Sequence, residues 1–265
     1  MTRLLVVQHE PDAPVAWLGE WWTELGLELD VVRGDLGEPV AAEWAADHDG
    51  LVVLGGAMGA CDDAVASWLA PTRALLADAV ARGVPTLGVC LGHQLAAVAL
   101  GGSVSRNPSG RTIGPVPVRL SGAAASDPLL GGFDGLAAIH YNDDVVTEVP
   151  TGATVLATLP DGRPQAIRFG PQAWGVQFHP ETSPEVFAAW LRWDSPNGLA
   201  PEQEMLLERV RASREELRAS WQPFAARFAA LVVAGAKEAE DGDVSGRPDV
   251  VHPAVDAPIG SPTTP

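Results

Sequence analysis

Short apolar runs alternate with segments of helical periodicity along residues 1–102. Runs rich in valine and leucine occur at 4–8, 27–33, 50–56 and 85–89, and each is typical of a buried strand. Between them, apolar residues recur every three or four positions at 17–25, 67–83 and 91–102, which predicts helices. This regular alternation predicts parallel βαβ units, with helices on both faces of one sheet.

The pattern changes between residues 112 and 178, where strand-like runs follow one another with turns and no helix between them. These runs read PVPVRL, AAIHYN, ATVLATL, QAIRF and AWGVQF. Consecutive strands that are joined by short turns pair in the antiparallel sense. The central sheet is therefore expected to gain antiparallel strands in this region.

A late segment, 201–234, carries an apolar stripe at helical spacing from Leu207 to Leu231. Pro223 predicts a break or a kink in it, because proline removes a helix hydrogen bond. Packing on the preceding domain is favoured over binding of a partner protein. From residue 237 the chain is acidic, punctuated by proline and without aromatic residues, which predicts disorder. The expected organisation is an α/β domain over 1–195, a helical appendage over 196–236 and a disordered tail over 237–265.

Composition limits the class of protein and its partners. The 265 residues, 46% of them apolar, suffice for one or two domains with a hydrophobic core. A formal net charge of −17 argues against nucleic acid and anionic membranes as partners. Two cysteines form no disulfide framework, and no apolar run resembles a signal peptide or a membrane span, so a cytoplasmic location is expected. The six histidines lack metal-ligand spacing, so no metal and no cofactor is expected.

One of the two cysteines stands between two glycines, where a predicted strand turns into a predicted helix. The segment Gly88-Val89-Cys90-Leu91-Gly92 has the form G-x-nucleophile-x-G, which in this setting is a nucleophile elbow. A helix amino terminus favours a thiolate at Cys90, and the Leu91 N–H is suited to bind an oxyanion. The competing interpretation is a buried cysteine that acts as a small hydrophobe.

A candidate general base follows the last predicted strand, AWGVQF, in the segment GVQFHPE. His179 comes just after that strand, so it is expected at the same sheet edge as Cys90. Glu181, two residues later, is able to hydrogen-bond the imidazole and orient it. A lone histidine at a strand end is more often structural, but the combination with a cysteine elbow favours a Cys-His-Glu triad.

GVCLGHQ and GVQFHPE together resemble the class I glutamine amidotransferases, the triad-type glutaminase domains of GMP synthase, carbamoyl phosphate synthetase and anthranilate synthase. A third segment, VVLGGAMGA at 52–60, resembles the oxyanion loop of that family. The resemblance covers about residues 3–192 and is closest to stand-alone GMP-synthase-like amidotransferase proteins. It implies a three-layer, flavodoxin-like α/β fold with a mostly parallel central sheet.

The resemblance also implies a mechanism on glutamine. Cys90 attacks the side-chain amide to form a γ-glutamyl thioester. His179 removes the thiol proton and then protonates the departing ammonia, and Glu181 orients the imidazole. Water releases glutamate. The oxyanion and substrate contacts implied in the same way are Gly55, Gly56, Leu91, Gln94, Tyr141, Asn142 and Asp143.

The chain departs from the family pattern at two places. Ala57 stands where the oxyanion loop usually has proline, and RTIGPVPV at 111–118 keeps only part of the EIGW run of close relatives. Both departures are able to alter glutamine affinity. His9 and Glu10 follow the first strand and are candidates for the pocket rim. Cys61 lies just after the oxyanion loop, where burial is expected rather than a role.

Three functions remain open on the sequence. The favoured one is a glutaminase that releases ammonia for a separate ATP-dependent synthetase, since no P-loop pattern follows the domain. A second is a hydrolase of γ-glutamyl amides or peptides, although such relatives usually carry a different residue at the position of Leu91. A third is a non-catalytic binding or regulatory protein that keeps the fold.

Overall fold

The computed structural model describes residues 1–244, and residues 245–265 lie outside the described part. Its main sheet has eight strands in the order β2-β1-β3-β4-β12-β11-β10-β7. The first five of these strands run parallel, and β11, β10 and β7 continue the sheet in the antiparallel sense. The bounds are β1 Arg3–Gln8, β2 Glu28–Arg33, β3 Gly50–Val53, β4 Thr86–Val89, β7 Arg119–Leu120, β10 Thr154–Thr158, β11 Pro164–Gly170 and β12 Ala173–Val176.

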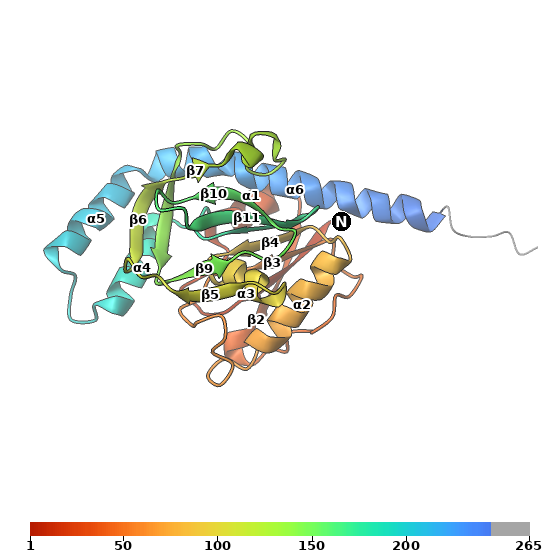
Figure 1. The fold of residues 1–265 in the computed structure, drawn as a ribbon, viewed down its shortest axis with the longest axis horizontal. Coiled ribbons are helices and arrows are strands. Elements are labelled where there is room, and N and C mark those ends of the chain that lie inside the picture. The colour runs from red at the N-terminus through yellow and green to blue at the C-terminus, as the bar shows by residue number, and fades with distance from the viewer. Residues whose placement is uncertain (245–265) are drawn as a thin grey trace, which may run out of the picture.

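Two helical layers enclose the sheet, one on each face (Figure 1). The buried side chains of α2 (Leu69–Ala81) and α3 (Leu91–Ala99) share one hydrophobic cluster. Those of α1 (Ala16–Glu24), α4 (Pro184–Asp194), α5 (Pro201–Ala212) and α6 (Arg214–Val244) share the other. Alternate residues of β1 and β3 point into one cluster or the other, because successive side chains of a strand face opposite ways. The predicted three-layer α/β fold is confirmed.

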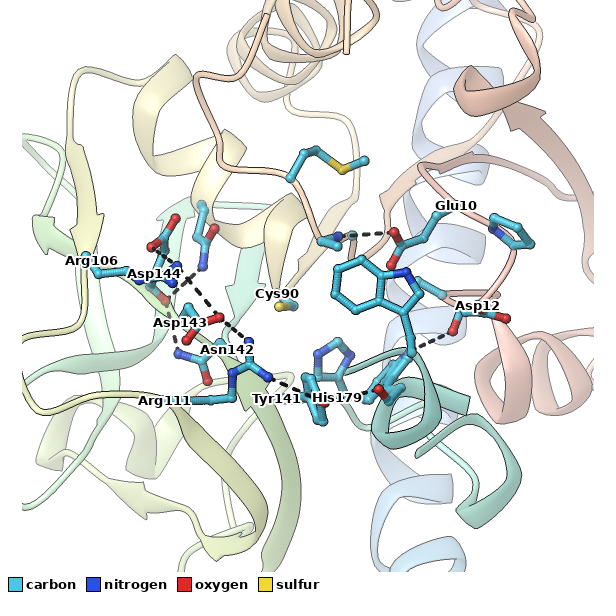
Figure 2. A pocket seen from close by; sticks show the side chains of 18 residues that line it. Glu10, Asp12, Cys90, Arg106, Arg111, Tyr141, Asn142, Asp143, Asp144 and His179 are labelled. Atoms are coloured by element: carbon cyan, nitrogen blue, oxygen red, sulfur yellow. Dashed lines mark hydrogen bonds and ion pairs between the residues drawn. The ribbon is translucent and has the colours of Figure 1, made fainter. Parts of the chain in front are cut away.

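The region from 103 to 148 differs from the prediction, because only part of it joins the main sheet. The strand β5 (Ser103–Arg106) pairs with β9 (Asp144–Glu148), and β6 (Thr112–Pro117) pairs with β8 (Ala137–Asn142), each as a separate antiparallel ribbon. Two short 3₁₀ helices, η1 (Gly34–Leu36) and η2 (Gly122–Ser126), complete the elements. The two ribbons bring polar residues of β5, β8 and β9 to one side of Cys90 (Figure 2).

The carboxyl-terminal helices pack on the α/β domain, as the sequence favours. Trp22 of α1 donates a hydrogen bond from its indole N–H to the Ala225 carbonyl at 3.0 Å, and its ring lies 5.6 Å from that of Phe228. The helix α6 continues through Pro223, so the predicted break does not occur. Trp221 and Phe224 on either side of the proline are both buried in one core, which keeps the two halves of the helix together.

The same helix ends at Val244, so regular structure extends past residue 237, where the tail was expected to begin. A helix that is anchored by buried aromatic residues upstream is able to propagate into a polar sequence. The predicted disorder of 245–265 falls outside the described residues. The division into domain, appendage and tail therefore stays a prediction. No helix within residues 1–244 combines the length and apolar content of a membrane span.

Candidate active site

Cys90 sits on a strained turn between β4 and α3. It is one of two non-glycine residues with positive φ in the described chain, at φ 50° and ψ −103°. Two glycines make this turn possible. A Cβ on Gly92 would lie 2.0 Å from the carbonyl oxygen of Val53, and one on Gly88 would lie 2.6 Å from the carbonyl carbon of Gly92. The chain therefore has the geometry of a nucleophile elbow.

Cys90 is buried, and it lies at the amino terminus of α3. The backbone N–H of Cys90 donates to the Val176 carbonyl at 2.8 Å, which ties the elbow to β12. The side-chain amide of Gln177 donates to the Cys90 sulfur at 3.5 Å. A helix amino terminus and an N–H donor both stabilise a negative charge on this sulfur.

His179 and Glu181 form a buried pair in the loop after β12. The two side chains are almost inaccessible to solvent, and the His179 Nδ1 lies 2.7 Å from a Glu181 carboxylate oxygen. The His179 backbone N–H donates to the Ile139 carbonyl at 2.8 Å, which fixes the loop against β8. A carboxylate at Nδ1 keeps a proton there and leaves Nε2 for the reacting atoms.

The charges around His179 favour its protonated form. Burial lowers its pKa, but the negative charges of Glu181 and Cys90 outweigh burial and raise the pKa to about 10. The indole ring of Trp190 has its centre 4.6 Å from that of the His179 imidazole. An aromatic ring at this distance attracts the positive charge of an imidazolium. The Glu181 carboxylate thus favours an imidazolium at His179, next to the Cys90 side chain.

The loop after β3 faces this pair. A Cβ on Gly55 would lie 3.0 Å from His179 Cε1 and 3.6 Å from Cys90 Cβ, so this glycine lets the loop approach both residues. Among the residues that the structure describes, the backbone N–H groups of Gly56 and Leu91 have no acceptor. Two free donors beside a nucleophile are what a tetrahedral oxyanion requires.

A cavity of about 500 Å³ opens above the cysteine. Figure 2 shows Cys90 between two walls, one with Arg106, Arg111, Asn142, Asp143 and Asp144, and the other with Glu10 and Asp12. The first wall carries charges of both signs, and the second carries acidic groups only. The cavity is also lined by Gly56, Ala57, Met58, Gln94, Tyr141, His179, Trp190 and Trp193.

Arg111 organises the first wall. Its guanidinium pairs with Asp143 at 2.5 Å and also with Asp194, and it lies over the Tyr141 ring at 5.1 Å from the ring centre. The Tyr141 hydroxyl in turn donates to Asp194 at 2.5 Å. The Arg111 guanidinium also holds the pKa of Asp143 below its usual range. Arg111, the first residue of the RTIGPVPV segment, therefore has a defined place in this pocket.

Residues 16–193 match the family described as Glutamine amidotransferase class-I. The chain belongs to the class I glutamine amidotransferases. This match confirms the resemblance that the cysteine elbow, the His-Pro-Glu turn and the glycine-rich loop suggested. Cys90, His179 and Glu181 lie within the matched residues, as do most residues that line the cavity, whereas Glu10 and Asp12 precede the matched range.

Individual relatives agree with this assignment. The chain is 36% identical over 176 residues to Anthranilate synthase component 2, pyocyanine specific, of Pseudomonas aeruginosa, covering 62% of this chain and 78% of that protein. It is 38% identical over 111 residues to the GMP synthase [glutamine-hydrolyzing] of Clostridium novyi, covering 40% of this chain but only 20% of that protein. A glutamine amido transferase of known structure from Methylobacillus Flagellatus superposes with a TM-score of 0.75 at 27% identity, covering 89% and 95% of the two chains.

The pocket of this amidotransferase includes most of the residues that the sequence predicts for it. Gln94 donates from its side-chain amide to the Asp144 carbonyl at 3.0 Å and to Gln177 at 3.1 Å. Asn142 donates to the same Asp144 carbonyl at 3.0 Å. Both side chains thus line the cavity while being fixed by β9. The roles of the predicted site residues stay predictions, with the geometry in their favour.

Two predictions about single residues are wrong. Cys61 is exposed, because the turn after the oxyanion loop carries it to the surface. His9 is absent from the pocket rim; it is buried behind the loop and accepts a hydrogen bond from the Trp68 indole at 2.9 Å. Burial lowers the His9 pKa to about 4, so its ring is neutral. Glu10 does line the cavity.

Sequence reasoning missed several pocket residues. Sequence reasoning also missed Gln177, which does not line the cavity but donates to Cys90; its place two residues before His179 in the GVQFHPE segment was a usable signal. Trp190 and Trp193 belong to α4, where the three-residue spacing looks like an ordinary packing face. Arg106 and Asp12 come from a ribbon and a loop and have no motif around them.

Proposed function

We propose that this amidotransferase hydrolyses the side-chain amide of glutamine to glutamate and ammonia. The observation that carries the proposal is Cys90 on its strained elbow beside the His179–Glu181 pair. The Cys90 thiolate attacks the amide carbon, and the Gly56 and Leu91 N–H groups stabilise the resulting oxyanion. The carbon–nitrogen bond then breaks as the His179 imidazolium donates its proton to the nitrogen, which leaves as ammonia. Water attacks the thioester carbon while His179 takes one of its protons; the carbon–sulfur bond then breaks, which returns the Cys90 thiolate and releases glutamate.

The mixed-charge wall supports an α-amino acid as substrate. Glutamine carries an ammonium and a carboxylate at one end, and the wall at β5, β8 and β9 offers carboxylates from Asp143 and Asp144 and guanidinium groups from Arg106 and Arg111. Gln94 and Asn142 add amide groups on the same side of Cys90. We place the amino-acid end of glutamine against this wall, with its side chain directed to the sulfur.

A separate synthetase is the proposed consumer of the ammonia. The chain spans about a fifth of the length of the GMP synthases of Clostridium novyi and Pyrobaculum aerophilum, and other relatives are named as a component or a subunit. Their names support a division of labour between a glutaminase chain and a partner. The test is to purify this chain from its natural host under mild conditions. A co-purifying ATP-dependent enzyme that raises the glutaminase rate supports the proposal, and an unchanged rate with every co-purifying enzyme contradicts it.

The substrate is tested by parallel assays of free glutamine and γ-glutamyl amides that carry larger amine groups. We expect glutamate and ammonia from glutamine in equal amounts, with a higher kcat/KM than for the amides. A preference for the substituted amides would make the chain a γ-glutamyl hydrolase. No turnover of either class, with Cys90 intact and unmodified, would make it a non-catalytic member of the family. The predicted cytoplasmic location and the expected absence of a metal stay predictions.

Replacing Glu181 with glutamine should lower kcat by about 10²-fold and leave KM nearly unchanged, because Glu181 contacts the imidazole and not the cavity. His179→Ala should lower kcat further, since it removes the acid and base itself. Steady-state kinetics of both variants, at equal folded fraction, measure the difference. A normal kcat with a much higher KM would make Glu181 a substrate ligand instead.

The pH dependence of kcat/KM should follow the raised pKa of His179. The imidazolium must be present to protonate the leaving nitrogen, so activity should be retained up to pH about 10 and fall above it. In Glu181→Gln the carboxylate charge is gone, and this high-pH limb should move to lower pH. Initial rates at low glutamine concentration, between pH 6 and pH 11, measure the high-pH limb in the wild type and in Glu181→Gln. An unchanged limb in the variant would show that another group controls it.

A further inference from the structure

The oxyanion loop of this chain has a hydrogen bond that the usual loop sequence cannot form. The Ala57 backbone N–H donates to a Glu10 carboxylate oxygen at 3.3 Å. Proline, the usual residue at this position, has no N–H to donate. The hydrogen bond to the Glu10 carboxylate therefore depends on the departure from proline at position 57.

The backbone of Glu10 is fixed by neighbouring residues of the segment after β1. The side-chain amide of Gln8 donates to the Glu10 carbonyl at 2.8 Å, and the Ala13 N–H donates to the same carbonyl at 3.4 Å. The residue before it, His9, is buried and tied to Trp68. These hydrogen bonds fix the backbone of the segment after β1. The Glu10 carboxylate extends from this fixed backbone to the loop at Ala57.

The loop is packed closely next to this hydrogen bond. A Cβ on Gly56 would lie 2.7 Å from the Met58 sulfur and 3.0 Å from both His9 Cβ and Leu91 Cδ2. Gly56 carries the N–H that the proposed mechanism directs at the oxyanion, and Ala57 is the next residue. A displacement of Ala57 would therefore turn the Gly56 peptide away from the position where the oxyanion forms.

We propose that Glu10 is a positioning residue that holds the Gly56 N–H in its oxyanion-binding orientation through the Ala57 N–H. The carboxylate replaces the conformational restriction that a proline ring would impose at position 57. This inference rests on the proposed glutaminase activity. Glu10 acts on the loop and contributes no proton to the reaction.

Glu10 could instead act by its charge on the His179 imidazolium, since both line one cavity. Two variants separate these roles. Glu10→Gln keeps a side-chain oxygen that accepts from Ala57 but removes the charge, whereas Glu10→Ala removes both. We expect Glu10→Ala to lower kcat about 5- to 100-fold with KM little changed, because a misplaced donor stabilises the transition state less. Glu10→Gln should stay within about 3-fold of the wild type, since a neutral acceptor still serves the N–H.

Rescue by proline tests the link to Ala57 directly. Adding Ala57→Pro to Glu10→Ala should recover most of the lost kcat, because the ring restricts the loop without any acceptor. Glu24→Ala, an exposed glutamate on α1 far along the chain from the loop, is the matched control and should behave as the wild type. Alkylation of Cys90 by iodoacetamide forms no oxyanion, so its rate should be the same in Glu10→Ala and the wild type.

Hydrogen–deuterium exchange of a peptide spanning 52–60 supplies a readout without substrate. Exchange should be faster in Glu10→Ala than in the wild type and in Glu10→Gln. Equal loss of kcat in Glu10→Gln and Glu10→Ala, a parallel fall in alkylation, or no rescue by Ala57→Pro would overturn the proposal. A wild-type chain without glutaminase activity would defeat the proposed function instead, and the exchange experiment would still report on the loop.

Discussion

Cys90→Ala should reduce glutamine hydrolysis at least about 10⁴-fold, to the background of the assay. The Cys90 sulfur forms the proposed thioester, and among the described residues that line the cavity no second thiol could replace it. The fold should remain intact, because alanine fills the same small space next to Gly55 and tolerates the turn no worse than cysteine does. Ammonia release and the urea midpoint, measured on the same preparation, check both expectations.

Cys61→Ala is the matched control for the loss of a thiol. Cys61 is exposed and lines no part of the cavity, so its replacement should leave turnover unchanged. Mass spectrometry after treatment with a glutamine-like chloroketone should find the label on Cys90 in the wild type and in Cys61→Ala. Retained turnover in Cys90→Ala, or its loss in Cys61→Ala, would contradict the elbow assignment.

Gly92→Ala should lower the free energy of unfolding by more than about 3 kcal/mol, the largest stability change that we expect from a single methyl group. The new Cβ would lie 2.0 Å from the Val53 carbonyl oxygen and 2.7 Å from its carbonyl carbon. Both atoms are backbone of a central parallel strand. Neither can move aside as a flexible side chain would, since Val53 pairs with β1 and β4.

Gly83→Ala separates this contact from the general effect of losing a glycine. Gly83 follows α2 at φ 72°, and nothing lies within 4 Å of a Cβ there. The expected loss is about 1 kcal/mol, which is the conformational penalty alone. Urea unfolding of both variants measures the difference, with soluble yield as a second readout. Equal stabilities would show that α3 and β3 are able to separate at the elbow without penalty.

Local pattern was enough to predict parallel βαβ units and the meeting of Cys90 with His179. Strand–helix alternation indicates a parallel sheet, and the carboxyl ends of parallel strands share one edge, so a cysteine after β4 and a histidine after β12 were expected together. The structure places them so, on adjacent strands. Gly88 indicated the same turn, because it lies against Gly92 within five consecutive residues, whereas the contact of Gly92 with Val53 is visible only in the structure.

Only the tertiary structure decided the rest of the pocket. Arg111, Asp143 and Asp194 come from three distant segments, and their pairing depends on two ribbons that leave the main sheet. The Glu10–Ala57 hydrogen bond joins residues 47 positions apart. No periodicity predicts such contacts, because a period specifies which face a side chain occupies and not which loop lies opposite it. Loop conformation and the packing of α4 and α6 set those distances, so the meeting of Cys90 and His179 was predictable from the sequence, whereas the ion pairs and hydrogen bonds within the walls were not.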